Sequence, residues 1–180
     1  PNSGTNERKM VAFATTAGAI KIFELMSSNI WVLLQTIPFL ANTFSSFTVD
    51  TRTFLVAIQY ACLTTCSDSQ GKSKVFVTDS MDDDFALLQN LQIRNPSGIA
   101  HYRRTHDYLA ISINLNDITV DTGSKAAVEW RSQLWKFNTN TDRFELEDQV
   151  IPSNLAYGVH TFESFENRQM VVLASKTWSE

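Results

Sequence analysis

The segment that decides the fold carries a glutamine among apolar residues, and it occurs three times: Leu33-Leu34-Gln35-Thr36-Ile37, Leu87-Leu88-Gln89-Asn90-Leu91 and, in a weaker form, Glu147-Asp148-Gln149-Val150-Ile151. The three glutamines are 54 and then 60 residues apart. Self-similarity at a period of this size is typical of proteins built from stacked structural repeats. The segment therefore predicts a repeat fold.

An aromatic residue in an alternating frame recurs in step with the glutamine: Ile20-Lys21-Ile22-Phe23, Lys74-Val75-Phe76-Val77 and Gln133-Leu134-Trp135-Lys136. Its copies are 53 and then 59 residues apart, so both markers lengthen by the same amount in the last unit. One enlarged loop explains both changes. The polar stretch from Asn114 to Arg131 is the candidate for that loop.

Two further kinds of segment complete each unit. The first is an apolar run: Met10–Ala14, Phe54–Ile58, Tyr108–Ser112 and Met170–Ala174. The second, less regular, precedes its return: Ser46–Val49, Ile99–Tyr102 and Val159–Phe162. Short β-branched and aromatic runs bounded by Asn, Asp, Ser and Thr predict strands joined by hairpins. The runs Phe54–Ile58 and Met170–Ala174 are expected to be inner strands buried on both faces.

Four strands per unit predict an all-β protein, a β-propeller of four-stranded antiparallel blades. We expect a polar N-terminal end at 1–9, repeat units at 10–53, 54–107 and 108–169, a further unit starting at 170–175, and a C-terminal end at 176–180. About three blades cannot close a ring. The remaining blades are expected from the rest of a longer chain or from other subunits. The opening Pro1 suggests a removed leader or a piece of a longer polypeptide.

The order of these segments resembles the epilepsy-associated (EAR, or epitempin) repeat over residues 10 to 175. That repeat has a glutamine strand, a strand with an aromatic, a "yLvvAn"-like apolar strand and another aromatic strand; the matching segments are Leu33–Ile37, Phe47–Val49, Phe54–Ala57 and Val75-Phe76. The Gly-Ala step usual after the glutamine strand is reduced to scattered small residues, Ala41, Gly98 and Ala156. The resemblance implies a seven-bladed propeller in extracellular or cell-surface proteins that bind other proteins.

Composition excludes several classes of function. An apolar content of 43% suits a folded globular protein. Acids and bases are interspersed at a net charge of −4, without the clustered Lys and Arg that a nucleic-acid partner requires. The most apolar stretch, Ile30 to Leu40, is shorter than the roughly 20 residues of a membrane-spanning helix. We expect neither nucleic acid as a partner nor a membrane span.

Polar residues offer few candidates for chemistry. Cys62 and Cys66 are expected to form a small disulfide; pairing with another chain is the alternative, since the spacing fits neither zinc nor thioredoxin-like sites. The acidic run Asp82-Asp83-Asp84 lacks the alternating ligands and glycine of a calcium loop and is expected to be a solvated turn. The three histidines, His101, His106 and His160, share no metal-site spacing.

The sequence predicts a binding protein and not an enzyme. Neither a Gly-x-Ser-x-Gly turn nor a phosphate-binding glycine loop occurs, and we expect no catalytic residues, cofactor or metal. Trp135 is expected in the core, whereas Trp130 and Trp178 have polar neighbours and are the candidates for ligand contact. We expect an extracellular protein-interaction or structural module. The alternative is an oligomeric propeller lectin whose exposed aromatics stack on sugar rings.

Overall fold

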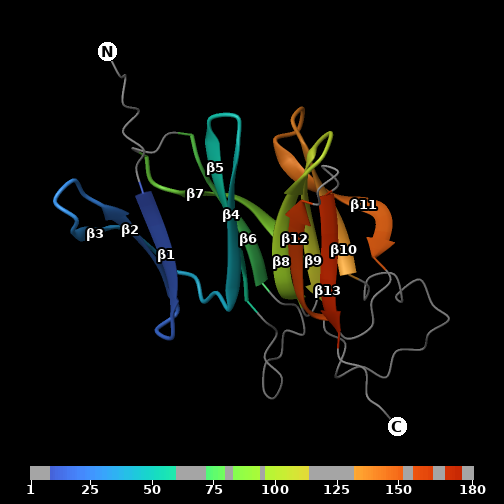
Figure 1. The fold of residues 1–180 in the computed structure, drawn as a ribbon, viewed down its shortest axis with the longest axis horizontal. Helices are drawn as coiled ribbons and strands as arrows, with labels where there is room; N and C mark the ends of the chain where they lie inside the picture. Colours follow the sequence, from blue (N-terminus) through green and yellow to red (C-terminus); the bar gives the residue numbers. More distant parts are fainter. Residues whose placement is uncertain are drawn as a thin grey trace, which may run out of the picture.

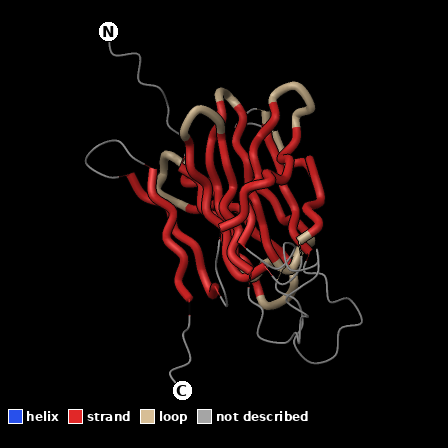
Figure 2. The backbone as a smooth tube through the Cα atoms, turned by 90° about the vertical axis from the view of Figure 1, so that its right-hand side faces the viewer, coloured by secondary structure: helices blue, strands red, loops and turns tan. Residues whose placement is uncertain are grey.

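A computed structural model describes residues 9–59, 72–79, 83–93, 96–113, 132–151, 156–163 and 169–175 of the chain. These residues form thirteen strands and no helix, which confirms the all-β prediction (Figure 2). None of them forms a helix of the length and apolarity needed to span a bilayer. Every segment that the sequence predicted as a strand lies within one of the thirteen.

The strands form four antiparallel sheets that follow the order of the chain. Sheet 1 contains β1 (Lys9–Thr15), β2 (Ala19–Leu25) and β3 (Trp31–Ile37). Sheet 2 contains β4 (Thr43–Val49), β5 (Arg52–Ile58), β6 (Lys72–Thr78) and β7 (Ala86–Gln92). Sheet 3 contains β8 (Pro96–Arg103), β9 (Asp107–Ile113), β10 (Ser132–Asn138) and β11 (Arg143–Ile151). Sheet 4 contains β12 (Ala156–Glu163) and β13 (Gln169–Ser175).

Figure 1 shows the sheets side by side, with β1–β3 at the left, β4–β7 in the middle and β8–β13 at the right. The described sheets form an open array and not a closed ring. Each sheet is a simple meander, because each strand pairs in antiparallel fashion with the next strand of the chain. The prediction of four-stranded antiparallel sheets is thus confirmed for sheets 2 and 3.

Two hydrophobic clusters fill the spaces between the first three sheets. The cluster between sheets 1 and 2 includes Ile20, Ile22 and Ile37 from one side and Leu55, Ala57 and Phe76 from the other. The larger cluster between sheets 2 and 3 includes Phe54, Val56, Leu109, Ile111, Trp135 and Phe144. Successive side chains of a strand point to opposite faces, so β5 contributes alternately to both clusters. Trp135 is buried, as predicted.

The inner strands differ in burial, and one expectation needs correction. Residues Phe54–Ile58 of β5 are buried on both faces, as the sequence predicted. Met170–Ala174 of β13 was expected to be buried in the same way, but Met170 and Val172 are exposed. The reason is position, because sheet 4 is the last sheet of the described array and only one of its faces packs against a neighbour.

Candidate binding site

Two of the glutamines found in the sequence repeat link sheet 1 to sheet 2 and sheet 2 to sheet 3. Gln35 on β3 accepts a hydrogen bond from the backbone N–H of Phe85 at 2.9 Å and donates one to the Phe85 carbonyl at 3.0 Å. Gln89 on β7 makes the same pair of bonds to Phe144 on β11, at 2.9 and 2.8 Å. One amide side chain thus satisfies two backbone groups of the following sheet, which would otherwise be costly to bury. We call this arrangement the glutamine clamp.

A β-bulge accompanies each clamp. The register shifts between Ile22 and Phe23 opposite β3, and between Val75 and Phe76 opposite β7. A bulge adds a residue to one strand and turns the side chains beside it. Leu34 and Leu88 are these extra residues, each directly before a clamp glutamine. Gln149 lies in β11, but its side chain falls outside the part of the chain that the structure describes.

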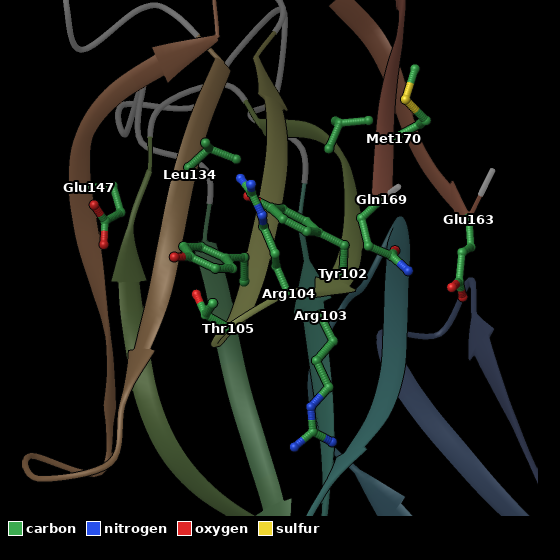
Figure 3. Close-up of a pocket in the computed structure, with 11 residues that line it drawn as sticks. Tyr102, Arg103, Arg104, Thr105, Leu134, Glu147, Glu163, Gln169 and Met170 are labelled. Atoms are coloured by element: carbon green, nitrogen blue, oxygen red, sulfur yellow. The ribbon is translucent and has the colours of Figure 1, made fainter. Parts of the chain in front are cut away.

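A hollow lined by described residues lies beyond the second clamp, between sheets 3 and 4. It has a volume of about 740 Å³, and its walls come from the β8–β9 hairpin, β10, β11 and the facing ends of β12 and β13. In Figure 3 Glu147 lies on one side of this cleft, and Glu163 and Gln169 lie on the other. Sheet 4 lies against β8 and β9, because β12 packs on these two strands of sheet 3.

Two tyrosines form the aromatic part of the cleft. The hairpin register places Tyr102 of β8 opposite Tyr108 of β9, and their rings stack with centroids 5.0 Å apart and planes 8° apart. Burial raises the pKa of the Tyr102 phenol, with Tyr108 adding to the rise and Arg104 opposing it. The Tyr102 phenol is neutral at physiological pH, because this shift adds to an ordinary tyrosine pKa that is already about 10. The pair therefore offers ring surface and two hydroxyl groups.

Charged and apolar groups complete the cleft. Leu134, Met170 and Val171 are the apolar contributors, while Arg103, Arg104, Glu147 and Glu163 bring both signs of charge. A site of this kind suits a partner with alternating apolar and polar side chains more than a single small anion or cation. The edge of β13 that faces away from β12 pairs with none of the described strands. An unpaired strand edge presents backbone N–H and C=O groups to an incoming strand.

A second polar group lies behind the cleft, on the opposite face of sheet 3. His101 Nε2 is 2.9 Å from Asp107 Oδ1, and the His101 ring stacks on Phe47 of sheet 2 with centroids 3.9 Å apart. Burial lowers the pKa of His101, and the hydrogen bond and charge of Asp107 only partly oppose this. Thr161 of β12 donates to the His101 carbonyl at 2.6 Å. These contacts hold three sheets together and leave the imidazole between packed layers.

The sequence-based candidates are distributed as follows. Cys62, Cys66, Trp130 and Trp178 lie outside the described residues, and so does Asp82 of the acidic run. Asp83 and Asp84 are exposed, as are His106 and His160. Across the described ranges, no group of three His, Cys, Asp or Glu side chains is arranged to hold a metal ion. The cleft brings none of the predicted site residues together.

Sequence reasoning missed the tyrosine pair. Its signal was available, since Tyr102 and Tyr108 flank the polar stretch Arg103 to Asp107 and a hairpin there makes them cross-strand neighbours. Nothing in the sequence indicated that the described part of sheet 4 has two strands where sheets 2 and 3 have four. Comparison with known protein families finds no match to the chain, and comparison with curated proteins also finds none.

Proposed function

We propose that the chain is part of a β-propeller of the epilepsy-associated repeat type and acts outside the cell or at its surface as a non-catalytic protein-interaction or structural module. The repeated glutamine clamp supports the propeller, because the same contact fixes sheet 1 to sheet 2 and sheet 2 to sheet 3. Four-stranded sheets packed in sequence are the building plan of propellers. The extracellular setting rests on the resemblance of the repeats.

The observation that carries the function is the cleft beside the open edge of β13. Backbone hydrogen bonds along such an edge provide affinity for an extended segment, and alternate side chains provide specificity. The walls supply the second element, because the Tyr102–Tyr108 pair and the apolar Leu134 and Met170 lie among charged groups. A protein segment in β conformation fits both elements.

The experiment is a binding screen against purified extracellular domains, read by surface plasmon resonance. Arg104→Glu reverses an exposed charge of the cleft, and Arg143→Glu makes the same change at the start of β11. We expect saturable binding to a protein that Arg104→Glu weakens at least tenfold and Arg143→Glu leaves unchanged. Binding that responds equally to both variants would place the interaction elsewhere on the chain.

A lectin is the second candidate, and the stacked tyrosines favour it. Sugar rings pack on aromatic faces, and the hydroxyl and charged groups beside Tyr102 offer hydrogen-bond partners. A glycan array with wild-type protein and Tyr102→Ala separates the two functions. Binding to glycans that requires Tyr102, without binding to any protein, would replace the first proposal by this one.

A further inference from the structure

Sheet 1 has a face that is covered in every later four-stranded sheet. The sequence repeat and the strand registers match residues on this face of sheet 1 with residues of sheets 2 and 3. In sheets 2 and 3 the matched residues face the preceding sheet. The sets are Val11, Phe13, Phe23 and Trp31 in sheet 1; Leu55, Ala57, Phe76 and Phe85 in sheet 2; and Leu109, Ile111, Trp135 and Phe144 in sheet 3. We call this the leading face of each sheet.

The exposure of matched residues shows that the leading face of sheet 1 lacks its cover among the described residues. Phe13 is 54% exposed, whereas Ala57 and Ile111 are both 0% exposed at the same position. Trp31 is 47% exposed, whereas Phe144 is 1% exposed. Leu33 is not diagnostic, because its counterpart Leu87 in the covered sheet 2 is equally exposed.

At the other end of the array, the described part of sheet 4 has two strands where sheets 2 and 3 have four. Its strands β12 and β13 correspond to the first and second strands of sheets 2 and 3, and none of the described strands occupies the places of a third and a fourth strand beside β13. The cleft lies at these places, against β10 and β11. Sheet 1 contains the other strands of the pattern, since β1, β2 and β3 correspond to the second, third and fourth strands of sheets 2 and 3.

The two incomplete sheets share one strand. Lys9-Met10-Val11-Ala12-Phe13-Ala14-Thr15 of β1 matches Gln169-Met170-Val171-Val172-Leu173-Ala174-Ser175 of β13, with the Met-Val pair and one alanine identical. Either strand therefore offers β12 nearly the same partner. A sheet of β12 followed by β1, β2 and β3 has the four strands of sheets 2 and 3.

We infer that the cleft binds sheet 1 of a second copy of this chain. Sheet 1 of that copy docks by its leading face, displaces β13 and pairs its β1 with β12. The inference rests on the proposed function in that it names the occupant of the same cleft, but the incoming strand pairs with β12 in place of the open edge of β13. The new interface continues the packing between sheets 1 and 2 and between sheets 2 and 3. At both of those interfaces a glutamine reaches the backbone of the residue that matches Trp31.

The geometry favours a pair of copies. Each copy has two four-stranded sheets and completes a third at the joint. A head-to-tail interface that closes leaves no open end.

The test is sedimentation equilibrium of the wild-type chain and three variants. Phe13→Glu and Trp31→Glu place a charge on the leading face of sheet 1, and both residues are exposed in a single copy, so folding tolerates the change. Leu87→Glu is the matched control, equally exposed but on sheet 2, whose leading face is already covered. We expect a wild-type dimer, a dissociation constant raised about 30-fold or more by the first two variants, and no change with the control.

Hydrogen exchange supplies a readout that general destabilisation does not imitate. In the dimer the amides of residues 169–175 should exchange rapidly because β13 is displaced, and in Phe13→Glu they should become protected by pairing with β12. A wild-type monomer at all concentrations, or equal protection of β13 in both proteins, overturns the inference. A monomer that binds another extracellular protein through Arg104 overturns it while the proposed function stands. A dimer whose dissociation constant is unchanged by Phe13→Glu overturns the inference as well.

Discussion

Gln89 and Phe144, which lie 55 residues apart in the chain, are joined by two hydrogen bonds between one side-chain amide and both backbone groups of a single residue. Gln35 and Phe85 are joined in the same way one sheet earlier. The contact is directional, since the glutamine always belongs to the earlier sheet. It is therefore a natural place to test how the sheets hold together.

Gln89→Ala should lower the free energy of unfolding by about 2 kcal/mol, because two hydrogen bonds are lost and two partly buried backbone groups stay unsatisfied. Urea denaturation followed by tryptophan fluorescence measures the change. Gln92→Ala, at the exposed end of the same strand, is the control and should change little. Equal effects of the two substitutions would show that the clamp contributes nothing specific.

Gly98→Ala should destabilise the protein by about 1 to 3 kcal/mol, because a methyl group at this site overpacks the space between sheets 3 and 4. A Cβ there would lie 2.8 Å from Ser112 Oγ and 3.1 Å from the Gly158 Cα. Gly158→Ala is the matched control, since nothing lies within 4 Å of its Cβ position. Thermal unfolding compares them, and a larger loss for Gly158→Ala would contradict this packing.

His101 should make the fold less stable as the pH falls. Burial lowers its pKa in the folded state, so below the ordinary value of 6.5 the unfolded chain binds more protons than the folded one. The free energy of unfolding should then decrease as the pH falls below about 6.5, and His101→Gln should show a flatter dependence. Urea midpoints between about pH 5 and pH 7.5 test this. Parallel curves for the two proteins would remove His101 as the cause.

Arg52 should contribute about 1 kcal/mol by joining sheet 2 to the β10–β11 turn. Its guanidinium pairs with Asp142, and its Nε lies 2.7 Å from Asp79 Oδ1. Arg52→Met and Asp142→Asn, alone and combined, form a double-mutant cycle; Asn is chosen because Asp142 has a φ of 54°. The coupling energy should shrink in about 1 M salt. Additive effects would mean that the ion pair contributes no stability.

Much of the fold could be predicted because its signals are local. Alternation around Phe76 and the continuous apolar run of β5 identify strands without knowledge of the rest of the chain. Spacing between Gln35 and Gln89 revealed that two distant segments are alike. Their bonding partners could not be predicted, because Phe85 and Phe144 are marked only by their backbone groups, which every residue has.

The candidate site was harder to predict because it follows from the number of strands in sheet 4. The composition of β12 and β13 does not differ from that of complete sheets, so the sequence gives no sign that a cleft lies beside them. Most of the Tyr102 side-chain surface is apolar, so the sequence pattern marks Tyr102 as an ordinary strand residue. Its role appears only when sheet 4 covers one half of sheet 3 and leaves the other half open.

The clamp also bears on how such a chain lengthens during evolution. Sheet 2 contains both halves of the contact, Gln89 that reaches forward and Phe85 whose backbone receives Gln35. A gene duplication that copies one whole unit therefore inserts a sheet that fits both neighbours at once, with no new contact to be selected. Duplication of part of a unit leaves one half unmatched, so the array is expected to grow and shrink by whole units.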